Sequence, residues 1–236
     1  MSRDYKAVFF DVGNTLLMPF PSVAGICAEV LSWRGHEVDP TKLTQAVAFA
    51  DETYEQRYRE DDSFWMKEAD TAKFWIELYA LMLDEVGLEG ELNDLAEDIY
   101  HEFGDGERWQ PYPDVVPTLE RLSNLGYRIG LVSNWDTRLT SISIDTGLSR
   151  YVDFVVSSAN VGYLKPQPEI FELALERADA EPQETLHIGD HYYADIMGAR
   201  SVGITPVLLD RHGLAPQADC LVINSLTEIV DYLRSN

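Results

Sequence analysis

The pattern of hydrophobic and polar positions divides the chain into three stretches. A short apolar run at residues 7–10 ends at Asp11 and predicts one buried strand. From Pro19 to about Arg108, apolar residues recur at helical spacing, and turn signals separate about four helices with no convincing strand. After Pro111, strand patterns and helix patterns alternate to the end of the chain.

This alternation predicts an α/β fold with a doubly wound, Rossmann-like parallel sheet, because short buried strands between helices of about ten residues need cover on both faces. We expect a core formed by residues 1–18 and 109–236, with a helical bundle at 19–108 inserted after the first strand. The later strands are expected at 128–132, 154–156, 185–188, 205–209 and 220–223. The helices between them are expected at 115–125, 137–146, 168–178, 194–202 and 226–233.

Composition and charge narrow the classes of function. The chain has 236 residues, 45 % of them hydrophobic, and a formal net charge of −23. It is too apolar for a disordered acidic chain, and its charge disfavours nucleic acid and anionic membranes as partners. An anionic substrate would need a local positive field from a metal ion, a lysine or a helix N-terminus.

The expected location is the cytoplasm. The apolar run before Asp11 is too short for a secretory signal, and no stretch approaches the roughly 18 apolar residues of a membrane span.

Polar residues follow four of the predicted strands. Asp11 follows the first strand, Ser133 and Asn134 follow the strand at 128–132, Lys165 lies in the loop after 154–156, and Asp190 follows 185–188. Any one of them alone is most often a helix cap, a turn or a solvated side chain. Ligands of such sheets bind at the carboxyl ends of the strands, so the four together predict a site there.

At these positions the chain resembles the haloacid dehalogenase superfamily of hydrolases, most of whose members are magnesium-dependent phosphatases. The four motifs that carry the resemblance are FFDVGNTLL, LVSNWD, YLKPQPEIF and HIGDHYYAD, in this order and over nearly the whole chain. The helical insertion stands where that family carries its first type of cap. We therefore expect the insertion to be a cap over the site.

The resemblance implies that Asp11 is the nucleophile and that the substrate is a small phosphorylated molecule. Asp11 and Asp190, together with the backbone carbonyl of Gly13, would hold Mg²⁺. Hard cations of this kind prefer oxygen ligands and share them with substrate phosphate. Lys165 would neutralise the Asp11 carboxylate and the phosphoryl oxygens, so that two anions can meet.

The resemblance assigns supporting roles to four further residues. Ser133 would donate its hydroxyl to the phosphoryl group, with the backbone N–H of Asn134 beside it. Thr15 would brace the first loop at the substrate site, and Asp195 would orient Lys165 or a metal-bound water. The oligomeric state, monomer or homodimer, stays open.

One departure from the family pattern concerns Gly13. The family's phosphatases carry a second Asp at this position, which protonates the leaving oxygen and then activates water. General acid–base catalysis is typically worth about 10²- to 10⁴-fold. Hydrolysis of alkyl phosphates is therefore expected to be slow, whereas acyl or aryl phosphates need the proton less.

Three explanations of this departure stay open. In the first, a slow or specialised phosphatase uses water, His191, Asp61 or Asp62 in place of the missing acid. In the second, the chain is a dehalogenase or a phosphonatase, since both types lack the second Asp. A phosphonatase needs a lysine in the cap, and the available lysines are Lys42, Lys67 and Lys73. In the third, the fold and the ion site serve binding with little turnover.

The insertion is rich in aromatic residues, which either pack its core or line a substrate pocket beneath a lid. In the lid interpretation, residues 19–21 and 110–113 are the hinges, and Tyr163 and Trp135 stand at the mouth of the site. The aromatic residues of the insertion include Trp33, Tyr54, Tyr58, Phe64, Trp65, Phe74, Trp75 and Tyr79.

Overall fold

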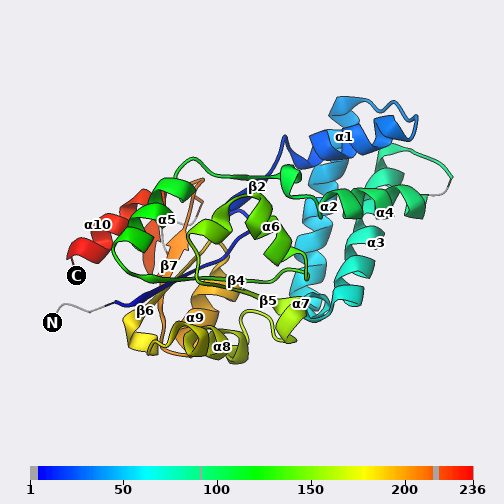
Figure 1. Ribbon diagram of the computed structural model, residues 1–236. Coiled ribbons are helices and arrows are strands. Elements are labelled where there is room, and N and C mark those ends of the chain that lie inside the picture. The colour runs from blue at the N-terminus through cyan, green and yellow to red at the C-terminus, as the bar shows by residue number, and fades with distance from the viewer. Residues whose placement is uncertain (1–4, 91, 215–217, 236) are drawn as a thin grey trace.

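A sheet of six parallel strands forms the centre of the computed structural model, which describes residues 5–90, 92–214 and 218–235 (Figure 1). In spatial order the strands are β5 (Phe154–Ser157), β4 (Arg128–Ser133), β1 (Ala7–Phe10), β6 (Thr185–Gly189), β7 (Thr205–Leu209) and β8 (Leu221–Ile223). The predicted doubly wound α/β fold is confirmed, and the predicted strands differ from the observed ones by at most one residue at either end.

Helices cover both faces of the sheet (Figure 1). Val8 and Phe10 of β1 pack into a core with α5 (Val115–Asn124), α6 (Leu139–Asp145) and α10 (Thr227–Ser235). Ala7 and Phe9, the alternate residues of the same strand, pack on the other face with α8 (Pro168–Ala178) and α9 (Gly198–Ser201). Successive side chains of a strand point to opposite faces, so a continuous apolar run is what a strand buried on both faces requires.

The order of the strands reverses direction next to β1. The chain passes from β1 to β4 and β5 on one side, then returns to β6, β7 and β8 on the other. Phe10, the last residue of β1, pairs with Leu131 of β4 and with Ile188 of β6. The carboxyl ends of these three strands therefore lie together at the switch point, where doubly wound sheets bind ligands.

The inserted segment folds into α1 (Val23–Trp33), α2 (Pro40–Glu60), α3 (Glu68–Val86) and α4 (Leu92–Glu102), with a short 3₁₀ turn, η1 (Ser63–Met66). These helices gather at one end of the molecule (Figure 1) and share a hydrophobic core of their own. Side chains begin the first two helices: Ser22 accepts a hydrogen bond from the Gly25 amide, and Asp39 accepts from the amides of Thr41 and Lys42. No helix among the described residues is long and apolar enough to cross a membrane.

The two segments that lead into and out of the helical insertion form an antiparallel ribbon that the sequence did not predict. Strand β2 (Leu17–Pro19) pairs with β3 (Trp109–Pro111), with Met18 opposite Gln110. Each strand has three residues and ends in proline, so neither shows an alternating pattern. The pairing becomes possible only once the intervening helices have brought the two segments together.

The helix expected at 194–202 differs from the observed one. It begins as a π-helical segment, η5 (Tyr192–Met197), and continues as α9. His191 caps this segment, since its Nδ1 accepts a hydrogen bond from the Ala194 amide. The remaining short elements are η2 (Gly106–Arg108), η3 (Leu148–Arg150), α7 (Ser158–Val161) and η4 (Pro182–Glu184).

Candidate active site

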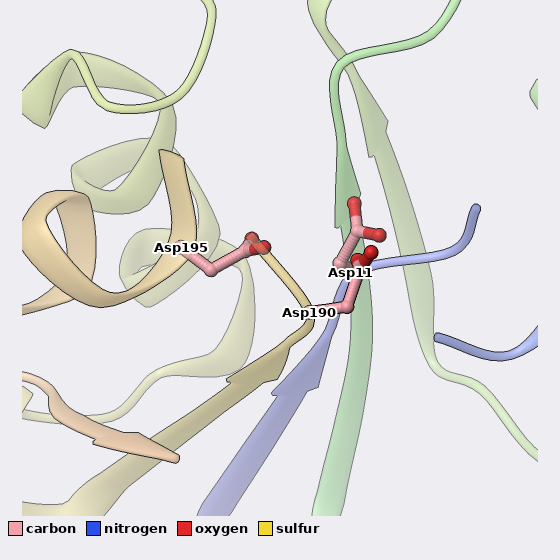
Figure 2. A group of neighbouring side chains, drawn as sticks. All are labelled: Asp11, Asp190 and Asp195. Atoms are coloured by element: carbon pink, nitrogen blue, oxygen red, sulfur yellow. The ribbon is translucent and has the colours of Figure 1, made fainter. Parts of the chain in front are cut away.

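Three aspartates meet at the switch point of the sheet. Asp11 directly follows β1, Asp190 directly follows β6, and Asp195 reaches toward them from η5, as Figure 2 shows. One carboxylate oxygen from each lies within 4.8 Å of the others. Residues separated by almost the whole length of the chain thus form one acidic cluster because parallel strands end at the same edge.

Lys165 supplies the positive charge inside this cluster. Its Nζ lies 2.5 Å from Oδ1 of Asp11 and 2.6 Å from Oδ1 of Asp195, and its side chain is only 2 % exposed. Burial by itself would lower the pKa of Lys165, but the charges of Asp11 and Asp195 outweigh burial and raise it. The ammonium group therefore keeps its proton and balances part of the negative charge.

The two oxygens of the Asp11 carboxylate have different surroundings. Oδ1 accepts hydrogen bonds from Lys165 Nζ and from Ser133 Oγ, the latter at 2.9 Å. Within the described parts of the chain, Oδ2 has no hydrogen bond or ion pair. One oxygen fixes the orientation of the carboxylate, and the other is left to bind a ligand or attack a substrate.

Both carboxylate oxygens of Asp195 accept hydrogen bonds from other residues of the protein. Oδ1 accepts from Lys165 Nζ and from His187 Nε2, which is 2.8 Å away, and Oδ2 accepts from the backbone amide of His191. Burial would raise the pKa of Asp195, but the contacts with Lys165 and His187 outweigh it and lower the pKa. This carboxylate therefore holds Lys165 in place and has little capacity left for a metal ion.

The close packing of Asp195 also explains Gly189. A Cβ at position 189 would lie 2.1 Å from Cγ of Asp195, so no other residue fits there without displacing the carboxylate. His187 contacts Asp195 from β6, and burial lowers the pKa of His187 and keeps its ring neutral. Because its Nε2 faces a carboxylate, which only accepts, the ring proton belongs on Nε2.

Asp190 has far less support than Asp195. Its Oδ1 accepts one hydrogen bond, from the hydroxyl of the buried residue Thr15 at 3.1 Å. Burial and the charges of Asp11 and Asp195 raise the pKa of Asp190 to about 8. Ionisation of Asp190 beside Asp11 is therefore unfavourable unless a cation joins Lys165 in offsetting the negative charge.

This donor set fits a hard divalent cation. Asp11 Oδ2 and Asp190 offer carboxylate oxygens, and the carbonyl of Gly13, which accepts a hydrogen bond from the Thr15 amide at 2.6 Å, keeps a second lone pair. Thr15 reaches Asp190 and the first loop but does not line the cavity. Its contacts are those of a brace, and its expected part in substrate binding stays a prediction.

Asn134 contacts the Lys165 loop through its side chain. Its Oδ1 accepts from the Lys165 amide at 2.7 Å, and its Nδ2 donates to the Lys165 carbonyl at 2.9 Å. This double contact fixes the backbone that carries the ammonium group. No local pattern in the sequence signals this contact, because the two residues stand 31 positions apart.

Trp135 lies beside position 13, where the family's phosphatases have the second aspartate of the first motif. A Cβ at position 13 would lie 3.4 Å from Cζ3 of Trp135, which is an ordinary van der Waals contact. The Trp135 ring is 9 % exposed and packs edge-on against Trp109, with ring centroids 4.8 Å apart. The space beside Gly13 therefore adjoins an indole ring rather than a carboxylate.

A cavity of about 510 Å³ separates the strand ends from the inserted helices. Asp11, Ser133, Asn134, Lys165 and Asp190 line it together with many aromatic residues of the insertion. His191 and Trp135 also line the cavity. The other residues considered from the sequence do not line it: Asp61, Asp62, Tyr163, Lys42, Lys67 and Lys73.

Several lining residues were not singled out from the sequence. Arg138 donates to Asp136 at 2.5 Å and to the Tyr100 carbonyl at 2.8 Å, so the structure commits this cation to protein partners. Asp51 also lines the cavity. Asp51 belongs to α2 and reaches the cavity only because the inserted helices dock onto the sheet, whereas Arg138 lies just after the LVSNWD motif, whose place after β4 could have pointed to it.

Known proteins resemble this chain over most of its length. The model of the haloacid dehalogenase-like hydrolase family matches residues 5–203. Haloacid dehalogenase-like hydrolase domain-containing protein 3 of Danio rerio is 32 % identical over 207 residues, covering 86 % of this chain and 84 % of its own. A glyceraldehyde 3-phosphate phosphatase of Methanopyrus kandleri is 29 % identical over 209 residues, which cover 87 % and 84 % of the two chains.

A solved structure gives the same result at the level of the fold. The crystal structure of the 2-haloacid dehalogenase from Pseudomonas syringae pv. Tomato DC3000 superposes with a TM-score of 0.68 at 26 % identity, covering 98 % of this chain and 99 % of that one. The four motifs, the acidic cluster at the switch point and these matches agree. The chain belongs to the haloacid dehalogenase-like hydrolase family.

Proposed function

We propose that this hydrolase is a Mg²⁺-dependent phosphatase of small phosphorylated molecules that uses Asp11 as its nucleophile. The observation that carries the proposal is the pair formed by Asp11 and Asp190, whose carboxylate oxygens lie together and suit a hard cation, while Lys165 is already paired with Asp11 and Asp195. The similarity to a glyceraldehyde 3-phosphate phosphatase supports the same class of substrate. Helices α1 to α4 would serve as the cap over the cavity.

In the first step, Oδ2 of Asp11 attacks phosphorus while the bond between phosphorus and the leaving oxygen breaks, which gives an aspartyl-phosphate. Ser133, whose hydroxyl donates a hydrogen bond to Asp11 in the free protein, is placed to donate to a phosphoryl oxygen. Lys165 offsets the negative charges of the Asp11 carboxylate and the phosphoryl group. In the second step, water attacks phosphorus, the bond to Asp11 breaks, and inorganic phosphate leaves. When bound by Asp11, Asp190 and the Gly13 carbonyl, Mg²⁺ would supply further neutralisation of the phosphoryl charge.

The position of Trp135 beside Gly13 affects the leaving group. An alkoxide needs a proton as it departs, and the indole N–H is a donor that does not give up its proton at neutral pH. The proton for an alkyl leaving group would then come from water, so alkyl phosphates should react slowly. Acyl and aryl leaving groups depart as more stable anions and tolerate the missing acid.

A second candidate is a dehalogenase that forms an ester on Asp11. The observation in its favour is the apolar contact at Gly13, together with the similarity to a 2-haloacid dehalogenase. Displacement of a halide from carbon needs no divalent cation, however, and gives no role to the carboxylate of Asp190 beside Asp11. This makes the phosphatase the stronger proposal.

The test measures phosphate release from acetyl phosphate with Mg²⁺ and after removal of divalent ions with EDTA. We expect turnover that EDTA abolishes, that Asp11→Asn abolishes, and that Asp190→Asn lowers by at least about 100-fold. Asp84→Asn, an exposed position of α3, is the matched control and should keep wild-type turnover. A wild-type protein that hydrolyses neither acetyl phosphate nor phenyl phosphate, or that releases chloride from 2-chloropropionate without metal, would overturn the proposal.

A further inference from the structure

Six aromatic rings form a continuous wall along the cavity. Neighbouring ring centroids lie between 4.8 and 6.0 Å apart, the usual range for aromatic pairs. From the insertion toward the sheet, the order of the rings is Tyr54, Trp75, Tyr79, Phe103, Trp109 and Trp135. All six line the same cavity as Asp11 and Lys165. We call this set the aromatic wall.

The aromatic wall joins the insertion to the sheet. It starts on α2 and α3, passes through β3 at Trp109, and ends at Trp135 in the loop after β4. Its last ring is the one beside Gly13. A leaving group bound to phosphate at Asp11 therefore meets ring surface at the place where the family's phosphatases present a carboxylate.

Two independent features of the wall favour the same kind of leaving group. Its rings offer stacking and edge-on contacts that an aromatic ring fills better than a polar or aliphatic group. Its end beside Gly13 provides no acid, which favours a leaving oxygen that departs without a proton. A phenol, whose pKa of about 10 is that of the tyrosine side chain, meets this requirement, and an aliphatic alcohol does not.

The charges around the cavity restrict which substituents an aromatic ring of the substrate can carry. Asp51 and Glu55 of α2 line the cavity near Tyr54, while the guanidinium of Arg138 is already bonded to Asp136. Glu55 pairs with Arg59 at 3.6 Å, and both side chains are exposed. A second negative charge on the substrate would face these carboxylates without a free cation nearby among the described lining residues.

We propose that the preferred substrates are aryl phosphate monoesters whose ring carries no further negative charge, with the phosphate at Asp11 and the ring against the aromatic wall. This inference rests on the proposed phosphatase function and names its substrate class. Asp11 takes the phosphoryl group from the phenolic oxygen, the phenolate leaves along the wall and takes a proton from water, and hydrolysis of the aspartyl-phosphate completes the turnover.

The first experiment compares kcat/KM for phenyl phosphate, cyclohexyl phosphate and acetyl phosphate in Mg²⁺. Phenyl and cyclohexyl phosphates are similar in size and charge, so we expect phenyl phosphate to be preferred by at least about 100-fold. Acetyl phosphate reports the proposed phosphatase function without a ring. If acetyl phosphate is hydrolysed but phenyl phosphate is no better than cyclohexyl phosphate, this inference fails and the phosphatase proposal stands. If no ester or anhydride is hydrolysed, both fail.

The second experiment separates the ring contact from the chemistry of the leaving group. Trp75→Leu removes a ring of the wall that belongs to α3, and it should lower the ratio of kcat/KM for phenyl phosphate to that for acetyl phosphate by about threefold to tenfold. Trp75→Phe keeps a ring and should restore most of the ratio. Trp33→Leu is the control, since Trp33 is 63 % exposed on α1 and lies outside the cavity. If folded Trp75→Leu has the same ratio of kcat/KM values as the wild type, the proposed contact between the substrate ring and the aromatic wall is wrong.

The third experiment tests the charge restriction. Phenyl phosphates with a para carboxylate and a para carboxamide have substituents of similar size, and we expect a lower kcat/KM for the carboxylate. Asp51→Asn should narrow the difference, because it removes one of the facing charges. Equal values for the two substrates in the wild-type protein would overturn the restriction.

Discussion

The ammonium of Lys165 donates to two carboxylates at once, to Asp11 at 2.5 Å and to Asp195 at 2.6 Å. One partner is the proposed nucleophile and the other is held by His187 and by the His191 amide. The two carboxylates thus fix the ammonium, which keeps its charge beside the proposed nucleophile. It has a structural role in this buried cluster as well as a proposed chemical one.

Removal of this cation should affect both stability and turnover. Lys165→Met leaves two buried carboxylates without their common partner, and breaking such a pair on one side typically costs about 3–5 kcal/mol. We expect a decrease of this order in the free energy of unfolding, measured with urea, and loss of detectable acetyl phosphate turnover.

Lys6→Met is the matched control for the loss of a lysine. Lys6 contacts Glu184 at 2.7 Å, but its side chain is 57 % exposed. Exposed ion pairs contribute little to stability, so Lys6→Met should lower the free energy of unfolding far less than Lys165→Met. A Lys165→Met protein as stable as Lys6→Met would show that the buried contacts contribute little.

The gain in activity from placing a carboxylate at position 13 should depend on Trp135. The Cβ of Gly13→Asp fits at 3.4 Å from the indole ring, but the carboxylate beyond it must share the space with that ring. We expect the single variant to raise hydrolysis of cyclohexyl phosphate by less than about tenfold. The double variant Gly13→Asp with Trp135→Ala should give a larger increase, toward the 10²-fold or more that general acid catalysis provides.

Steady-state kinetics with cyclohexyl phosphate checks this expectation, and Trp135→Ala alone is the control. The single Trp135 variant opens the space but supplies no acid, so it should not raise the rate. If Gly13→Asp alone reaches the rate of the double variant, the indole ring does not restrict the new carboxylate.

A third prediction concerns Asp114, which ties the start of α5 to the C-terminal part of the core. Its carboxylate accepts two hydrogen bonds from Arg211 at 3.0 Å, one from Ser225 at 2.9 Å and one from the Leu226 amide at 2.9 Å. Burial would raise the pKa of Asp114, but these bonds outweigh burial and lower it below its ordinary value of 3.8. The ionised form therefore stabilises the folded state.

The sign of the pH dependence follows from this lowered pKa. The contribution of Asp114 is fully present above the pKa of about 3.9 in the unfolded chain and is lost as the pH falls through the lower folded value. We expect Asp114→Asn to lower the free energy of unfolding by about 1–3 kcal/mol at pH 7. The difference from wild type should shrink at pH values below about 4. Urea titrations at several pH values measure this, with Asp84→Asn as the control. A difference that grows toward acid would contradict the assignment.

Much of the fold could be predicted because the signals are local. The apolar runs at β1, β4, β6 and β7 are buried on both faces of the sheet, so each strand is visible without knowledge of its neighbours. The ribbon of β2 and β3 was missed for the opposite reason. Its short strands depend on a pairing across about 90 residues and have no pattern of their own.

The candidate residues divide in the same way. The sequence by itself determined which chemical groups the carboxyl edge of the sheet carries. These are Asp11, Ser133 and Asp190 at strand ends, and Lys165 in the segment that follows β5. It also showed that position 13 has no carboxylate. These conclusions need only the position of each strand along the chain and the identity of the residues that follow it.

Only the tertiary structure decided what surrounds those groups. It placed Trp135 against Gly13, engaged both oxygens of Asp195 with protein donors, and aligned rings from Tyr54 to Trp135 into one wall. These contacts join segments that are distant in the sequence, and their geometry depends on how the inserted helices dock on the sheet. Local periodicity carries no information about that docking, whereas the docking fixes the shape and charge of the cavity.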